Sequence, residues 1–176
     1  MAELRPDNPY IVERFADPEN KVEFPPEAKK KFEWILSRYP TKMAALLPTL
    51  HLAQEVWGWI SPEAMVYIGD LLDLSPATVY GVVTFYHMYN LKPVGKYHVQ
   101  VCTNLSCMIR GAYDLYEQCH EKHGMPMGGV SQDGRFTLME VECLGSCGTA
   151  PVVQVNNDYH ENMNVEKMSE LLGKLK

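Results

Sequence analysis

The sequence has no long apolar run, no strongly basic segment and no start of the kind that directs secretion. Without about 18 consecutive apolar residues, no membrane-spanning helix is expected. The formal net charge is −6 and no Lys/Arg-rich run occurs, which argues against a nucleic-acid partner. The first fifteen residues carry acids and lack an apolar middle, so we expect a cytoplasmic protein.

Cysteine is scarce, with five residues in 176. An odd number does not complete a disulfide framework, and disulfides do not persist in the cytosol. Nucleotide-binding fingerprints are missing too, since no G-x-G-x-x-G lies at a strand–helix junction and no P-loop occurs. This chain alone is therefore not expected to bind a dinucleotide tightly. Hydrophobic residues make up 46% of the sequence, enough for one ordinary core or two small modules.

The amino-terminal half is typical of a small helical bundle. Residues 1–22 contain several prolines and predict an irregular lead-in, whereas apolar residues at helical spacing in residues 23–92 predict four helices. Two of these helices have a Ser-Pro start, in which Ser61 or Ser75 caps the helix and the following proline occupies its first position. Gly58 is the expected stop of the helix before them.

The pattern changes at residue 93, where Pro93 and Gly95 mark a linker. Residues 93–176 predict a second domain with the order β-α-β-β-β-α, and the whole chain is expected to be of the α+β class with a mixed sheet. His98 alternates with the apolar residues of the first strand, so we expect it to be exposed or at an interface. The segments are KYHVQVC, GAYDLYEQCHEKHG, GRFTLMEVEC, PVVQVN, DYHENM and NVEKMSELLGKL.

Four of the five cysteines form two pairs, each in a loop that follows a predicted strand. Four residues separate Cys102 from Cys107, and three separate Cys143 from Cys147. Loops on a rigid sheet edge are common sites of binding chemistry, and four thiolates that meet there can hold a metal. Cys119 lies within a predicted helix, where a small buried side chain is the simpler interpretation.

Spacing alone leaves two metal centres open. A structural zinc ion takes four cysteines in pairs two to four residues apart, and a [2Fe–2S] cluster also takes four thiolates. Gly145 and Gly148 favour the cluster, because they let the backbone wrap closely around a bulky anionic group. A thioredoxin-type dithiol requires C-x-x-C at a helix start, and neither pair has that spacing.

Longer motifs around these cysteines resemble a known family. CTNLSCMIRGA and ECLGSCGTAPVVQVN resemble the cluster-binding segments of the small iron–sulfur subunit of respiratory NADH:quinone oxidoreductase (complex I), called the small flavoprotein subunit in mitochondria. LLPTLHLAQEVWGWISPEAM and VYGVVTFYHMY resemble the helical signature of the same family. The similarity extends from about residue 24 to the carboxyl terminus.

The resemblance implies a helical bundle followed by a thioredoxin-like [2Fe–2S] ferredoxin domain. It implies one cluster bound by Cys102, Cys107, Cys143 and Cys147. It also implies a partner subunit that binds FMN and NADH, within a complex on the cytoplasmic face of the inner membrane. Related chains serve NAD-linked hydrogenases and formate dehydrogenases. Ser146 stands where the family leads us to expect alanine, and our hypothesis is that its hydroxyl donates to a cluster sulfur.

Overall fold

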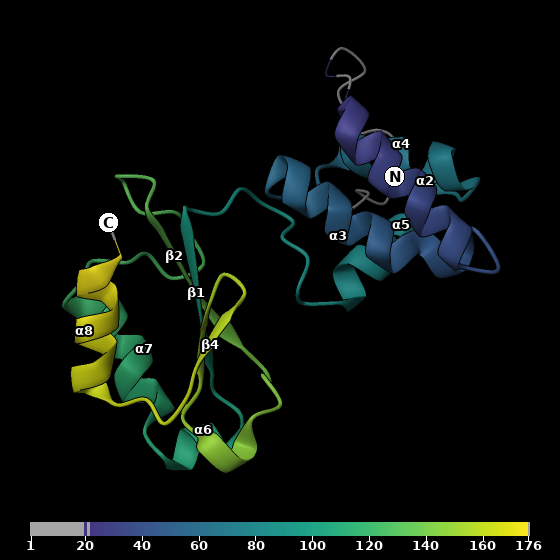
Figure 1. The fold of residues 1–176 in the computed structure, drawn as a ribbon. Coiled ribbons are helices and arrows are strands. Elements are labelled where there is room, and N and C mark those ends of the chain that lie inside the picture. The colour runs from purple at the N-terminus through teal and green to yellow at the C-terminus, as the bar shows by residue number, and fades with distance from the viewer. Residues whose placement is uncertain (1–19, 21, 176) are drawn as a thin grey trace, which may run out of the picture. The chain divides into compact units, whose positions relative to one another are not determined.

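A computed structural model describes Asn20 and residues 22–175, and the chain divides into two compact units between Pro93 and Val94. The irregular lead-in predicted for residues 1–22 lies almost wholly outside the described residues. The first unit is helical, and the second combines a sheet with helices (Figure 1). Each unit has its own hydrophobic core.

The helical unit contains α2 (Pro26–Arg38), the 3-10 turn η2 (Met43–Ala45), α3 (Leu46–Trp57), α4 (Pro62–Leu72) and α5 (Pro76–Phe85). The Ser61 and Ser75 side chains accept hydrogen bonds from the third backbone N–H after them, which confirms both predicted caps. Gly58 ends α3 with φ +80, a left-handed conformation that glycine adopts without strain. Helix α5 ends at Phe85.

The second unit contains β1 (Tyr97–Cys102), α6 (Leu105–Ile109), α7 (Ala112–Glu121), β2 (Phe136–Val141), the 3-10 turn η3 (Cys147–Thr149), β3 (Val153–Val155), β4 (Asp158–His160) and α8 (Val165–Lys174). The strand order is β2-β1-β3-β4, with β1 parallel to β2 and antiparallel to β3. This is the predicted order of elements with one short helix, α6, added between β1 and α7; it contains Cys107.

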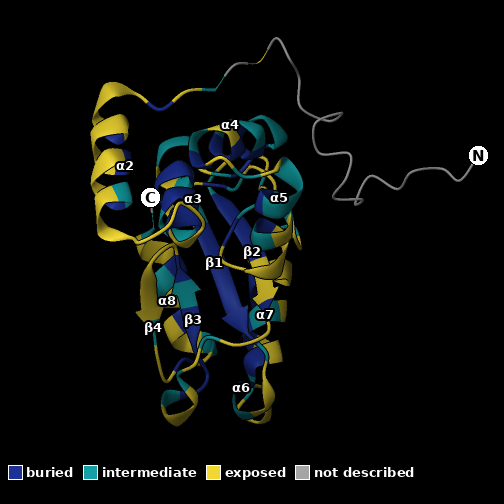
Figure 2. Ribbon diagram, turned by 90° about the vertical axis from the view of Figure 1, so that its right-hand side faces the viewer, coloured by how far each residue is buried: buried dark blue, intermediate teal, exposed yellow. Residues whose placement is uncertain are grey.

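Helices α7 and α8 lie side by side against one face of this sheet (Figure 1). Strand β1 is central and buried along nearly its whole length (Figure 2). Its Val99 and Val101 side chains are fully buried with Leu138 of β2 and with Leu115 and Met168 of the two helices. The packed sheet thus gives a rigid support for the loops at its ends.

Gly95 is more than a linker residue, because it packs directly against the start of β2. Its N–H donates to Thr137 Oγ1 at 2.8 Å, and a Cβ on Gly95 would lie 2.8 Å from backbone atoms of Phe136. We expect Gly95→Ala to lower the free energy of unfolding by about 1–3 kcal/mol, as overpacking does elsewhere. Denaturant unfolding measures the loss. Gly173→Ala is the matched control, since a Cβ there meets open space, and an equal loss in both variants would contradict the close approach.

The prediction that His98 is exposed or at an interface is wrong as regards exposure, because only 6% of the residue is accessible. His98 lies on the central strand between β2 and β3, and its Nε2 has no hydrogen-bond partner among the described residues. Burial lowers the pKa of His98 below its usual value, because the charged imidazolium is poorly solvated there.

This burial makes the stability of the protein depend on pH. Below about pH 6.5 His98 is protonated in the unfolded chain but stays neutral in the folded chain. The free energy of unfolding therefore decreases as the pH falls towards the lowered pKa of the folded state. We expect His98→Phe to reduce the loss of stability between pH 7.5 and 5.5. Urea unfolding of both proteins at the two pH values measures the difference, and an identical loss would show that His98 does not contribute.

Candidate functional site

The two cysteine pairs lie at the same end of the sheet, because β1 and β2 are parallel and in register at their last residues. Cys102 ends β1 opposite Val141, which ends β2, and Cys143 follows two residues later. The carboxyl ends of parallel strands share one edge, so both loops start there. The second loop returns to the sheet at Val152, whose carbonyl accepts from the Cys102 N–H at 3.1 Å.

The first pair is held by burial. Cys102 and Cys107 are each only 3% exposed. The pKa of the Cys107 thiol is raised to about 11, chiefly by burial and also by the neighbouring Cys102 side chain. The helix α6 carries Cys107 and is capped by the Asn104 side chain, which accepts from the Leu105 N–H at 2.8 Å.

The second pair is exposed. The Cys143 sulfur accepts from the Gly145 N–H at 3.3 Å, and Gly145 has φ +74, which confirms that this glycine allows a tight turn. Cys147 begins η3. Thus the structure buries Cys102 and Cys107 beside the sheet edge and leaves Cys143 and Cys147 exposed in the second loop.

In residues 20 and 22–175, no three histidine, cysteine or carboxylate side chains close around one point where a single metal ion would fit. The donor set still suits a [2Fe–2S] cluster, which takes four thiolates shared between two irons. All four donors are cysteines, they come from two loops at one edge, and the Gly145 N–H points at the Cys143 sulfur. The residues present therefore fit such a cluster in donor type and number.

Cys119 lies apart from this edge, in the last turn of α7, and is fully buried. Burial raises the pKa of its thiol to about 12. Cys119 is carried by a helix and not by either of the two cysteine loops, which agrees with its prediction as a core residue.

Two carboxylates accept hydrogen bonds from residues next to the cysteines, and neither was predicted from the sequence. Glu140 Oε1 accepts from Thr103 Oγ1 at 2.6 Å and from the Tyr113 hydroxyl at 3.3 Å. The Glu161 carboxylate accepts from the hydroxyls of Ser146 and Thr149. The Ser146 hydroxyl therefore has a partner other than the cluster sulfur that we expected.

The sequence pattern around Glu140 and Glu161 gives little indication of their role, for different reasons. Glu140 alternates as an ordinary outward residue of a strand, so nothing in the pattern sets it apart. Glu161 lies in DYHENM, the predicted return strand of the hairpin, although the observed strand ends at His160. The return of that hairpin towards the second cysteine loop was the one available clue.

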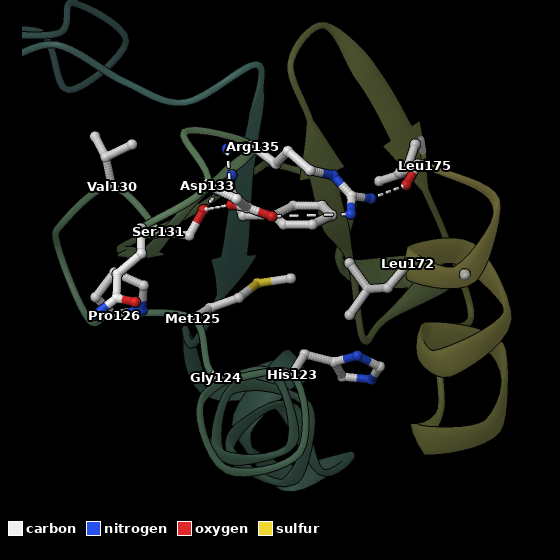
Figure 3. A pocket seen from close by; sticks show the side chains of 13 residues that line it. His123, Gly124, Met125, Pro126, Val130, Ser131, Asp133, Arg135, Leu172 and Leu175 are labelled. Atoms are coloured by element: carbon white, nitrogen blue, oxygen red, sulfur yellow. Dashed lines mark hydrogen bonds and ion pairs between the residues drawn. The ribbon is translucent and has the colours of Figure 1, made fainter.

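A pocket of about 990 Å³ lies at the opposite end of this unit, between the start of β2 and the ends of α7 and α8 (Figure 3). The Arg135 guanidinium donates to the Leu175 carbonyl and lies 4.8 Å from the centre of the Phe136 ring. Elsewhere in the pocket lining, the Ser131 hydroxyl donates to the Asp133 carboxylate. The described residues that line the pocket include no cysteine, so it is separate from the candidate metal site.

Comparison with known proteins shows the family of the chain. The sequence pattern of the thioredoxin-like [2Fe-2S] ferredoxin family matches residues 32–176. The chain belongs to this family. One [2Fe–2S] cluster is accordingly its cofactor, and the predicted bundle and thioredoxin-like ferredoxin fold are confirmed.

Named relatives of this ferredoxin extend the match over both units. A Rickettsia bellii protein, named as a subunit of NADH-quinone oxidoreductase, is 46% identical over 147 residues, which are 82% of this chain and 88% of the relative. The Dictyostelium discoideum protein named NADH dehydrogenase [ubiquinone] flavoprotein 2, mitochondrial, is 39% identical over 88% of this chain and 64% of its own length. The resemblance to the small iron–sulfur subunit of NADH:quinone oxidoreductase is thereby confirmed.

A solved structure has a similar fold. A chain of an NAD+-reducing [NiFe]-hydrogenase in the air-oxidized state superposes with a TM-score of 0.64 at 19% identity. The match covers 74% of this ferredoxin and only 22% of the hydrogenase chain. At that identity the likeness concerns the fold alone.

Proposed function

We propose that this ferredoxin is the electron-transfer subunit of a respiratory NADH:quinone oxidoreductase, in which its cluster exchanges single electrons with the FMN of an NADH-binding partner. The observation that carries the proposal is the pair of cysteine loops at one sheet edge, in a chain that relatives named as NADH-quinone oxidoreductase subunits match over both units. No general acid or base is needed for this function.

We assign the cluster ligands as Cys102, Cys107, Cys143 and Cys147. The buried pair forms the inner side of the site, and the exposed pair faces solvent, where a partner can approach. When bound, the cluster accepts and releases one electron at a time, with a potential of about −400 mV if it behaves like plant-type ferredoxins. The N–H of Gly145 stabilises negative charge on the Cys143 sulfur.

Cluster binding has a proton cost that follows from burial. The Cys107 thiol, with a pKa raised to about 11, is protonated at neutral pH in the metal-free chain. A thiol must lose its proton to bind iron. This buried ligand would therefore release a proton if it bound iron.

The partner subunit is inferred from the missing nucleotide-binding motifs of this chain and from the names of its relatives. No dinucleotide fingerprint occurs in the sequence, so FMN and NADH are assigned to a separate flavoprotein subunit. The helical unit supplies no cluster ligand and is the surface we assign to docking that subunit. None of the described helices is long and apolar enough to cross a bilayer, and we place the chain on the cytoplasmic face of the membrane through the complex.

Electron exchange with the flavin is tested by mixing the chain with an FMN- and NADH-binding subunit. We expect the dithionite-reduced cluster to be reoxidised by NAD+ when that subunit is present and to stay reduced when the isolated chain is given NAD+. Visible absorbance follows the reoxidation under anaerobic conditions. Reoxidation of the isolated chain at the same rate would contradict the assignment of nucleotide chemistry to the partner.

A further inference from the structure

The segment that follows β4 runs beside the second cysteine loop. The Tyr159 hydroxyl donates to the Leu144 carbonyl at 3.1 Å. The Asn162 N–H donates to the Thr149 carbonyl at 2.7 Å, and the Met163 N–H donates to the Pro151 carbonyl at 3.0 Å. These hydrogen bonds fix Glu161 opposite the turn that carries Cys147.

At that position one carboxylate oxygen of Glu161 accepts hydrogen bonds from both hydroxyls of the turn. Glu161 Oε1 accepts from Ser146 Oγ and, at 2.7 Å, from Thr149 Oγ1. The two hydroxyl oxygens also lie 2.7 Å apart, within hydrogen-bonding distance of each other. The hydrogen bonds from Ser146 and then Thr149 lower the pKa of Glu161, so the carboxylate is ionised when it holds them.

The turn needs such a restraint because packing does not supply one. Cys147 is exposed, whereas Cys102 and Cys107 are held by burial. Gly148, the next residue, has no side chain, and a Cβ built on it meets nothing within 4 Å. Glycine on this side adds backbone freedom, so hydrogen bonds to the flanking residues are what restrict the orientation of the Cys147 thiol.

We propose that Glu161 is a positioning residue of the cluster site, which fixes the turn from Ser146 to Thr149 and thereby orients the Cys147 sulfur. The inference rests on the assignment of Cys147 as a cluster ligand. Glu161 acts through the two hydroxyls and does not itself touch the cluster. Its effect is therefore on the geometry of one ligand and on how firmly that ligand is held.

Three variants separate positioning from a simple effect of charge. Glu161→Ala removes both the acceptor and the charge, whereas Glu161→Gln removes the charge and keeps an amide oxygen that can accept from the hydroxyls. Glu170→Ala removes the same charge from an exposed site on α8. If Glu161 acts by positioning, hydrogen exchange of the turn and the rate of cluster loss should change strongly in Glu161→Ala, weakly in Glu161→Gln and not at all in Glu170→Ala.

Hydrogen exchange of the full-length protein as purified is the first measurement. We expect the peptide covering residues 144–151 to exchange about tenfold faster in Glu161→Ala, as for the loss of one hydrogen bond to a charged group. Peptides from α7 should be unchanged. Because this measurement does not depend on which metal the protein carries, it still tests the positioning role if the iron–sulfur assignment fails.

The reduced-state electron paramagnetic resonance spectrum and the rate of cluster loss to a chelator are the second measurement. Glu161→Ala should shift the g-values and speed cluster loss, and Thr149→Val should do the same. Since both remove one network, their effects should not add in the double variant.

Two outcomes would overturn the proposal. One is that Glu161→Ala has the same hydrogen exchange, the same electron paramagnetic resonance spectrum and the same rate of cluster loss as the wild type. The other is an equal effect of Glu161→Gln and Glu161→Ala, which would make the charge, and not the hydrogen bonds, responsible.

Discussion

Serine in place of any one of Cys102, Cys107, Cys143 and Cys147 removes most of the cluster from the purified protein. A hydroxyl is a harder and far less acidic ligand than a thiol, and the site has one thiolate for each of four positions. Iron, acid-labile sulfide and visible absorbance should fall from about one cluster per chain to a small fraction of that value. This is the largest effect that we expect from a single substitution.

Cys119→Ser provides the matched control, since it makes the same chemical change at a buried position in α7. We expect it to keep the wild-type cluster content, with some loss of stability because a hydroxyl is placed in an apolar core. Loss of the cluster in Cys119→Ser, with retention in Cys143→Ser or Cys147→Ser, would contradict the ligand set.

The position of each ligand gives a further distinction among the four variants. Cys143 and Cys147 are exposed, so their serine variants should lose the cluster and keep the secondary structure seen by circular dichroism. Cys102 and Cys107 belong to the hydrophobic core of the sheet unit, so serine there should also lower its thermal stability. Equal thermal stability in all four variants would mean that burial does not distinguish the two pairs.

Residues 94–176 expressed alone should fold and retain the cluster, and should lose co-purification with the FMN-binding subunit. The fragment contains all four proposed ligands and a complete core, in which Val99, Leu138 and Met168 are fully buried. The helical unit, which we assign to docking, is absent from it. Iron and sulfide content measures the first expectation, and pull-down of the flavoprotein against the full-length chain measures the second.

Either half of this experiment can fail on its own. A fragment that captures the flavoprotein as well as the full-length chain does would show that the sheet unit carries the docking surface. A fragment that is unfolded by circular dichroism would show that its core is insufficient without residues 1–93. The iron–sulfur assignment survives the first result, because cluster content is measured separately.

The sequence predicted those parts of the fold that depend on local chemistry. Ser61 and Ser75 each cap the helix expected of them, and both accept a backbone N–H. Alternating apolar residues identified the strands, and parallel pairing of β1 with β2 then brings the cysteine loops to one edge. The ligand types and their spacing restricted the chemistry to zinc or iron–sulfur, and family resemblance was needed to choose.

Other features depend on contacts that local patterns do not encode. Helix α6 has only five residues, too few for an apolar period, and its Leu105 and Ile109 are exposed. His98 alternates as a surface residue would, yet both neighbouring strands flank it. Glu161 reaches the Cys147 turn across a hairpin, through hydrogen bonds between residues 12 and 15 positions apart.

The central claim is that sulfur atoms from two loops hold two bridged irons, and metal analysis after anaerobic purification tests it most directly. We expect about two irons and two acid-labile sulfides per chain, as a [2Fe–2S] cluster requires. The dithionite-reduced protein should show the rhombic electron paramagnetic resonance signal of a single unpaired electron. A colourless protein with one zinc ion per chain and no acid-labile sulfide would contradict the account.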